Sequence, residues 1–410
     1  MSLPILFFWI VVGVLAYTYV GYPLLIWMAS RLRRQRPTGG EAAEPPLVTV
    51  LVVAYNEEVR IEERINNLLS CDYPSGRLQI LVASDGSDDA TAEKARASGS
   101  RIVTVVEFED RRGKSAVLNE LIPQSRGEIV VLSDARQRFD ASVFRVLVRA
   151  FRDPDNGAVS GELVLERRGA GSEIGEGAGF YWRYEKFIRR NESRVDSTVG
   201  CTGAIYAIRR TLFKPIPETV ILDDVLIPML IARQGYRVRF ESRARAYDEV
   251  SATASGEFRR KVRTIAGNFQ LFYRQPWLLD PLRNRLWVQT VSHKGFRLLG
   301  PLFLCAAFAL NAVLVAAPAY RYLLVAQGVF YGAAALGHVT RHARWRPFFL
   351  SVPYTFCLLN VTTIIAFFSL LGGRQRVTWN KSTEKGSSHV RLLKSCESDS
   401  VRNNRSNLSA

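Results

Sequence analysis

Long apolar stretches mark both ends of the chain, and a region of mixed character lies between them. The first, "LPILFFWIVVGVLAYTYVGYPLLIWMA" (3–29), contains no charged residue. As a helix it is long enough to cross about 30 Å of hydrocarbon, so the pattern predicts a transmembrane helix within residues 1–30. A cleavable signal peptide usually has a basic start, a shorter apolar core and a small-residue cleavage site, and this stretch shows none of these.

A second apolar block covers residues 298–372 and divides into about three transmembrane segments. If the chain starts outside, three spans would leave the basic tail outside as well, so an alternative is that one segment is re-entrant or split at Pro353. Residues 276–297 combine aromatic and basic side chains, which predicts an amphipathic interfacial segment, with a solvated connector as the alternative. Residues 382–410 are rich in Ser, Asn and Arg, which predicts a disordered tail.

The middle region, residues 47–275, alternates between buried strands and amphipathic helices. The Val-rich run "PPLVTVLVVAYNEE" predicts a strand covered on both faces, and "EEVRIEERINNLLSC" then shows helical spacing of its apolar residues. The same alternation continues through "LQILVASDGS", "DDATAEKARAS", "RIVTVVEF", "SAVLNELI" and "EIVVLSDA". This order predicts an α/β domain with a mostly parallel, doubly wound sheet and right-handed crossovers.

Polar side chains follow three of the predicted strands at the point where each strand ends. Tyr55, Asp85 and Asp134 occupy these positions, and Lys114 lies in a loop that leads to the same edge. Ligands of such sheets bind beyond the carboxyl ends of the strands. A base can stack on Tyr55, Asp85 can accept from a base imide, Asp134 can hold a divalent cation and Lys114 can neutralise phosphate, which together indicate a nucleotide site. The alternative for each aspartate is a simple turn.

Charge and cysteine usage narrow the class of protein. The net charge of +17 includes basic clusters at 31–36 and 341–346, beside the apolar stretches, which is typical of cytoplasmic membrane edges rather than of nucleic-acid binding. The middle domain is therefore expected in the cytoplasm, with the lipid bilayer as a partner and no nucleic acid. The five cysteines show neither metal nor disulfide spacing. The chain has no Walker A motif and no GxGxxG after the first strand, which weakens an ATPase or dinucleotide interpretation.

Two adjacent carboxylates, Asp223 and Asp224, stand at the head of the apolar stretch "LDDVLIPMLIARQG". Repulsion between them and partial burial both raise a carboxyl pKa, so the pair suits a proton acceptor. The alternative is a helix N-cap, a position that favours Asp.

Seven motifs occur in one order along residues 48–275: "VTVLVVAYNEE", "LVASDGSDD", "RGKSAVLN", "VLSDAR", "GCTGAIYAIRR", "LDDV" and "RRKVRTIAGN". Together with the flanking apolar blocks they resemble the family 2 glycosyltransferases, in particular the membrane-embedded type similar to cellulose and hyaluronan synthases and exopolysaccharide glycosyltransferases. The resemblance implies a GT-A-like, Rossmann-related nucleotide-sugar domain. It further implies inverting transfer from a UDP-sugar to a glycan or lipid-linked acceptor at the cytoplasmic face of a bacterial inner membrane, with possible export partners for the polysaccharide.

The resemblance also implies residue roles. Asp224 would be the catalytic base with Asp223 beside it, and Asp134 would hold Mg²⁺ or Mn²⁺. The acceptor loop would be Gly200, Cys201, Thr202 and Gly203, and the nucleotide-sugar would contact Tyr55, Glu57, Asp85, Lys114, Asp134, Arg260 and Arg263.

Two motifs depart from the family pattern. Arg136 replaces the second carboxylate of the DxD metal motif, and the QxxRW motif keeps only its arginine, Arg263, with Arg260 and Thr264 in place of Gln and Trp. The first change questions tight metal coordination, and the second questions processive synthesis. A catalytically inactive nucleotide-binding scaffold and a transport-associated protein are therefore the alternatives. The apolar stretches carry no acidic residue, which argues against a transport path.

Overall fold

The computed structural model describes residues 2–33, 44–166, 176–249, 254–341 and 347–373. The predicted disordered tail, 382–410, lies outside the described residues, as do residues 342–346 of the basic cluster 341–346 and residues 34–36 of the basic cluster 31–36.

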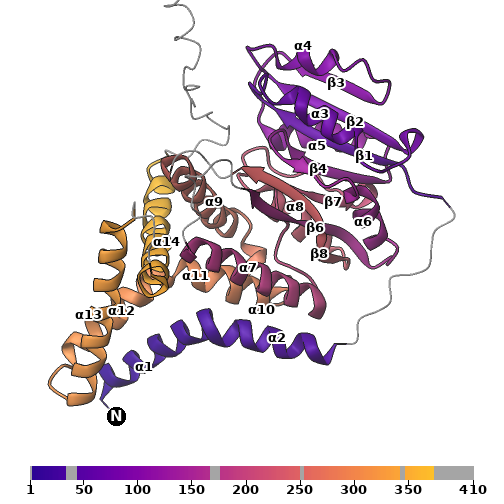
Figure 1. Ribbon diagram of the computed structural model, residues 1–410. Helices are drawn as coiled ribbons and strands as arrows, with labels where there is room; N and C mark the ends of the chain where they lie inside the picture. The colour runs from indigo at the N-terminus through magenta and orange to yellow at the C-terminus, as the bar shows by residue number, and fades with distance from the viewer. Residues whose placement is uncertain (1, 34–43, 167–175, 250–253, 342–346, 374–410) are drawn as a thin grey trace, which may run out of the picture. The chain divides into compact units, whose positions relative to one another are not determined.

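A single eight-stranded sheet forms the centre of the middle region (Figure 1). Its spatial order is β3-β2-β1-β4-β7-β6-β8-β5. The neighbours β3, β2, β1 and β4 run parallel, whereas β7 is antiparallel to both β4 and β6. The predicted mostly parallel α/β sheet is confirmed, and the antiparallel strand extends it on the far side of β4. The strands are β1 Val48–Ala54, β2 Leu78–Asp85, β3 Val103–Phe108, β4 Ile129–Asp134, β5 Arg138–Phe139, β6 Asn156–Glu166, β7 Tyr206–Arg209 and β8 Arg237–Glu249.

The central strands are buried on both faces because helices cover each face. Along β1, Val50 and Val52 pack into one hydrophobic cluster and Leu51 packs into the other. The first cluster takes in α3 and α6, and the second takes in α5 and α8. This two-sided burial is why the strands read as continuous apolar runs. The helices are α3 Ile61–Leu69, α4 Thr91–Arg96, α5 Lys114–Gln124, α6 Val143–Ala150 and α8 Asp223–Arg233.

Among the residues that the structure describes, four helical segments are long and apolar enough to cross a membrane: Leu3–Leu32, Trp287–Val313, Pro318–Val339 and Phe348–Leu371. The sequence analysis expects one transmembrane helix within residues 1–30 and about three within 298–372, and this assignment stays a prediction. The fourth segment runs through Pro353 without interruption. The second begins inside the stretch expected to be interfacial, because its helix starts at Trp287. These segments comprise α1 Leu3–Ala16, α2 Tyr22–Leu32, α10 Trp287–Gln289, α11 Phe296–Leu298, α12 Gly300–Val313, α13 Pro318–Val339 and α14 Phe348–Leu371.

A buried polar contact joins the first and second candidate spans to α7 (Glu176–Val195). Glu192 of α7 accepts a 2.5 Å hydrogen bond from Tyr22 Oη, and His293 Nδ1 lies 2.9 Å from the same carboxylate oxygen. Apolar packing of Ile26 on Ile188 extends this contact. Polar groups so deeply buried are stable only when paired, so the three side chains fix α2, α7 and the start of the second span together.

The helix α9, Ala254–Arg274, packs along the fourth candidate span. Val262 and Ala266 of α9 form a small apolar cluster with Ala366 of α14, and the rings of Phe269 and Phe367 meet edge to face at 5.3 Å. Since α9 also carries Arg260 and Arg263, this packing places the helix that bears two of the predicted site residues beside a candidate membrane helix.

Candidate active site

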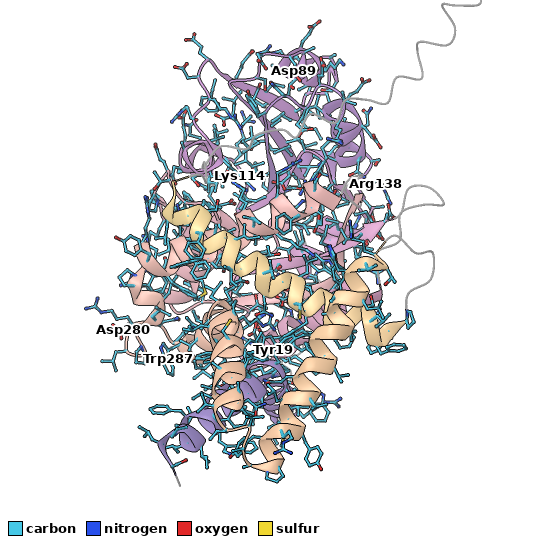
Figure 2. The ribbon with its side chains drawn as sticks, turned by 90° about the vertical axis from the view of Figure 1, so that its left-hand side faces the viewer. Tyr19, Asp89, Lys114, Arg138, Asp280 and Trp287 are labelled. Atoms are coloured by element: carbon cyan, nitrogen blue, oxygen red, sulfur yellow. The ribbon has the colours of Figure 1, made fainter. Side chains whose placement is uncertain are left out.

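Lys114 lies between two carboxylates that are far apart in the sequence. Its Nζ is 3.0 Å from Oδ1 of Asp134, the last residue of β4, and 3.5 Å from Oδ2 of Asp223, the first residue of α8. Gly113, with φ of +89°, allows the turn that places Lys114 at the first position of α5. Figure 2 labels Lys114 inside the sheet domain, well away from Tyr19 and Trp287. The lysine therefore joins three elements at the carboxyl edge of the parallel strands.

The charges of this cluster stabilise one another. Burial disfavours the charged form of Asp134, but Lys114 and Arg136 outweigh that effect and lower its pKa. Burial acts against the ammonium of Lys114 in the same way, and the carboxylates of Asp134 and Asp223 raise its pKa above the ordinary value. Both groups consequently stay ionised at neutral pH, as a site for an anionic diphosphate requires.

The two adjacent aspartates begin α8 rather than cap it. The residue in the N-cap position is Leu222, and Asp223 and Asp224 occupy the first helical turn. The N-cap alternative is therefore wrong for both aspartates. Asp223 is 7% exposed and accepts a 3.0 Å hydrogen bond from the buried hydroxyl of Tyr206 on β7. The free amides at the helix start favour negative charge at both positions.

Asp224 has the electrostatic character of a proton acceptor. Burial, followed by the adjacent charge of Asp223, raises its pKa to about 6, while Lys114, Lys294 and Arg189 act in the opposite direction. A carboxylate with a pKa just below neutral is mostly deprotonated at pH 7 and is still basic enough to take a proton in a transition state. The two aspartates thus have different surroundings, which is typical of pairs that divide catalytic roles.

The glycine-containing segment 200–203 lies directly against Asp224. The backbone N–H of Cys201 donates a 2.7 Å hydrogen bond to the backbone carbonyl of Asp224. A Cβ on Gly203 would lie 2.9 Å from Oδ2 of Asp224, so only glycine leaves the carboxylate its present position. Gly200 has φ of +83°, a conformation that also favours glycine. The fourth member, Thr202, accepts a 2.9 Å hydrogen bond from Arg189 of α7.

At the edge of the sheet where the nucleotide is predicted to bind, the side chains of Asp85 and Tyr55 contact other residues of the protein. The carboxylate of Asp85 accepts hydrogen bonds from the backbone N–H groups of Arg112 at 2.7 Å and Gly113 at 2.9 Å. The guanidinium of Arg111 lies 3.7 Å from the centre of the Tyr55 ring. Asp85 thus holds the loop that leads to Lys114, and one face of Tyr55 is covered by an arginine that the sequence analysis did not select.

Glu57 is the remaining residue predicted at that edge. Its backbone N–H donates a 2.7 Å hydrogen bond to Thr91 Oγ1, and its carboxylate lies 3.6 Å from Arg60. These contacts place Glu57 in the turn that leads from β1 into α3.

Arg136 and Arg260, which depart from the two family motifs, both lie near one buried carboxylate. Asp248, on β8, has a side chain that is 4% exposed. Its Oδ2 lies 3.2 Å from Arg136 Nε and 3.6 Å from Arg260 Nη1. Sequence reasoning missed Asp248 because it belongs to no motif, and its only signal is its position near the end of a long strand. The structure thus links Arg136 to Arg260, which are 124 positions apart (260 − 136).

Arg263 belongs to the same cluster as the aspartates. Burial lowers its pKa, and the charges of Asp223, Asp134 and Asp224 act to raise it. The guanidinium of Arg263 therefore interacts electrostatically with all three site carboxylates. This is expected for a residue that helps to neutralise a diphosphate.

The fit of a divalent cation rests on Asp134. Among the described residues, no three side chains of His, Cys, Asp or Glu gather to form a ligand set. Magnesium, however, is commonly bound by one or two carboxylates together with substrate phosphates. One ionised carboxylate at the strand edge can supply the protein's part of such a site, so Asp134 fits a cation that is also held by substrate phosphates.

These features define a GT-A-like domain: a mixed, mostly parallel sheet between helices, with a carboxylate and lysine cluster at the strand ends. The profile of the "Glycosyltransferase like family 2" matches residues 45–267, more than half of the chain. The chain belongs to this family of glycosyltransferases, and the family predicted from the motifs is confirmed.

Individual relatives support the same conclusion. Poly-beta-1,6-N-acetyl-D-glucosamine synthase of Staphylococcus aureus (strain COL) is 26% identical over 235 residues, and the synthase of Staphylococcus epidermidis is 25% identical over 236. These matches cover about half of this chain and of each relative: 55% and 56% for the first. A solved structure, "Mannosyltransferase PcManGT from Pyrobaculum calidifontis in complex with GDP-Man and Mn2+", aligns with a TM-score of 0.67 and 25% identity, over 90% of this chain and 100% of that one.

Proposed function

We propose that this chain is an inverting membrane glycosyltransferase that moves a sugar from a UDP-sugar to a hydroxyl of a glycan or lipid-linked acceptor. We place this reaction at the cytoplasmic face of a bacterial inner membrane, in the synthesis of an exopolysaccharide or another surface glycan, with export partners. The observation that carries the proposal is Asp224, whose carboxyl pKa is raised to about 6 and which lies against Gly203 of the acceptor loop. The family and the four candidate membrane segments support the setting.

The chemistry follows from the positions of the charged groups. The acceptor hydroxyl enters beside the 200–203 loop and gives its proton to the carboxylate of Asp224. Its oxygen attacks C1 of the donor sugar while the bond from C1 to the diphosphate oxygen breaks, which inverts the configuration at C1. Lys114 and Arg263 neutralise the departing diphosphate. A divalent cation held by Asp134 and the diphosphate would supply further charge neutralisation.

The comparisons support a nucleotide-sugar donor without fixing the base or the sugar. The staphylococcal relatives are named for a polymer of N-acetyl-D-glucosamine, and the solved neighbour is described with GDP-Man. The Mn²⁺ in that neighbour supports a divalent cation at this type of site. We extend to this chain the general features of a nucleotide-sugar donor and a glycan acceptor, and we propose UDP as the nucleotide.

The test is release of nucleoside diphosphate by membranes that contain the full chain, supplied with a panel of UDP- and GDP-sugars and with Mg²⁺ or Mn²⁺. Turnover with one UDP-sugar is expected, and Asp224→Asn is expected to reduce it by at least about 100-fold. The matched control is Glu93→Gln, which removes an exposed carboxylate from α4, and it should keep full activity.

Three outcomes would contradict the proposal. Equal turnover by Asp224→Asn would exclude Asp224 as the base. Preference for a GDP-sugar would overturn the UDP assignment. Retained nucleotide binding without turnover of any donor would favour the inactive scaffold.

A further inference from the structure

A polar cavity lies at the opposite edge of the sheet from the carboxylate and lysine cluster. Its volume is about 560 Å³. It is lined by residues just before β6, in the first half of β8, at the end of α7, just after α2 and just before α10. Because β6 and β8 run in the same direction as β4, their first residues lie at the far edge from Asp134. The cavity is therefore separate from the proposed site of sugar transfer.

The lining of this cavity carries an excess of positive charge, with seven arginines against four carboxylates. Asp196 pairs with Arg237 at 3.9 Å and with Arg285 at 3.3 Å, and Glu241 pairs with Arg243 at 2.9 Å. The remaining arginines make no ion pair with any residue that the structure describes; they are Arg33, Arg190, Arg194 and Arg239.

Two of these arginines bear directly on the ligand. Arg239 keeps a buried Nε–H for which the described residues supply no hydrogen-bond acceptor. Burial lowers the pKa of Arg237; Asp196 and Asp153 act to raise it, while Arg239 and Arg33 add to the lowering, so both guanidinium groups repel that of Arg237. Leaving a buried donor unsatisfied is costly, and an anion would relieve both the repulsion and the missing bond. Guanidinium groups bind phosphate in a bidentate manner, so the cavity fits a phosphate-bearing anion.

The neighbourhood of the cavity points to a lipid as the source of that phosphate. Arg33 directly follows the candidate span Leu3–Leu32. The last turns of α2 expose Met28 at 56% and Leu32 at 88%, and Arg31 lies over the ring of Trp27 at 5.4 Å. Exposed apolar groups, tryptophan and arginine together are typical of a helix at the level of the headgroups.

We propose that the arginine-lined cavity at the end of α2 and α7 binds the phosphate headgroup of an anionic phospholipid. Basic cavities beside membrane helices bind such headgroups through the excess charge. The bound lipid would hold the edge of the sheet domain at the membrane surface, while the carboxyl edge of the sheet carries out the reaction. The proposal concerns a different edge of the sheet and does not depend on the donor or on Asp224.

The test measures the thermal unfolding midpoint of the full chain in a neutral detergent, titrated with phosphatidylglycerol, phosphatidylcholine or inorganic phosphate. Phosphatidylglycerol is expected to raise the midpoint, and the other two are not. Arg194→Gln and Arg239→Gln are each expected to weaken the apparent lipid affinity about fivefold. The matched control is Arg101→Gln, which removes an exposed arginine before β3 and should leave the lipid response unchanged.

Each other outcome overturns the proposal. An unchanged response in both cavity variants, or an equal loss in Arg101→Gln, would mean that the lipid binds elsewhere. A shift with inorganic phosphate equal to that with phosphatidylglycerol would assign the cavity to a soluble phosphate compound. Arg194 is exposed, so Arg194→Gln is expected to fold normally, and retained sugar transfer by that variant would separate a binding defect from misfolding.

Discussion

The hydroxyl of Tyr206 donates a 3.0 Å hydrogen bond to Oδ2 of Asp223, and both side chains are buried. Asp223 in turn contributes to the raised pKa of Asp224, so a tyrosine on β7 helps to set the electrostatics of the proposed base. The contact crosses from the antiparallel part of the sheet to the start of α8, and it fixes the carboxylate of Asp223 next to Asp224.

Tyr206→Phe is expected to lower the free energy of unfolding by about 2 kcal/mol, because a hydrogen bond to a charged acceptor is lost in a buried place. It should also lower kcat about tenfold, since Asp223 then loses one of the two contacts, with Tyr206 and Lys114, that position it beside Asp224. Thermal unfolding and nucleoside diphosphate release measure the two effects. The control is Tyr73→Phe. The hydroxyl of Tyr73 donates to the backbone carbonyl of Pro46, far from the aspartates, so this variant should lose stability but keep its kcat. Unchanged kcat in Tyr206→Phe would count against the role of the contact in positioning Asp223.

The pH dependence of kcat/KM should report the proposed base. With a pKa of about 6, Asp224 is protonated below that value, so activity is expected to rise with pH through about 6. Asp223→Asn removes the adjacent negative charge, lowers the pKa of Asp224 and should shift the rising limb to lower pH. A limb that stays in place in Asp223→Asn would assign it to another group.

The same pKa predicts an effect on stability with a definite sign. The folded-state pKa of Asp224 lies above its ordinary value of 3.8, so the folded chain binds the proton more tightly than the unfolded chain. This contribution to stability is present below about pH 4 and is lost as the pH rises to about 6. Asp224→Asn, which cannot ionise, is therefore expected to unfold at a higher temperature than the wild type at pH 8, while it loses activity. A lower midpoint at pH 8 would contradict the burial of this charge.

Gly203→Ala should disturb the base without removing it. The added Cβ would lie 2.9 Å from Oδ2 of Asp224, so the carboxylate must move. A displacement of about 1 Å can lower a rate about 100-fold. We therefore expect kcat to fall by about tenfold to 100-fold. Gly76→Ala is the control, because nothing lies within 4 Å of the Cβ it would introduce. Equal activity of the two variants would show that the loop does not constrain Asp224.

Arg136→Asp tests the altered metal motif. A second carboxylate near Asp134 should strengthen cation binding, so the Mn²⁺ concentration that gives half-maximal activity is expected to fall about tenfold in membranes washed with chelator. Arg136→Gln is the matched variant, since it also breaks the 3.2 Å contact with Asp248 but adds no carboxylate, and it should not lower that concentration. An equal fall of the half-maximal Mn²⁺ concentration in both variants would mean that the loss of the Arg136 charge, and not the added carboxylate, strengthens cation binding.

The local sequence was enough to predict much of the fold and part of the site. Strands buried on both faces must be continuously apolar, so β1, β2 and β4 are visible as runs, and the residues that end them, Asp85 and Asp134, follow from the geometry of a parallel sheet. The candidate membrane segments are visible for a related reason, because a helix that crosses hydrocarbon needs about 20 mostly apolar residues in a row.

Contacts between distant segments could not be predicted in this way. The pairing of Asp248 with Arg136 and Arg260 depends on the register between β6 and β8 and on the packing of α9. Arg111 on the face of Tyr55 depends on how one loop closes over another. None of these residues belongs to a periodic pattern, because a single contact between distant segments produces no repeat in the sequence.

The sequence by itself therefore determined the class of domain and the motifs that identify the family. Tertiary structure alone decided that Asp223 is held by Tyr206 and Lys114, that Asp224 has a raised pKa, and that a cavity rich in arginine lies at the other edge of the sheet. The physical reason is the distance along the chain over which each property is determined. Hydrophobic periodicity is a property of neighbouring residues, whereas burial and electrostatic fields are summed over every group that folding brings near, wherever it stands in the chain.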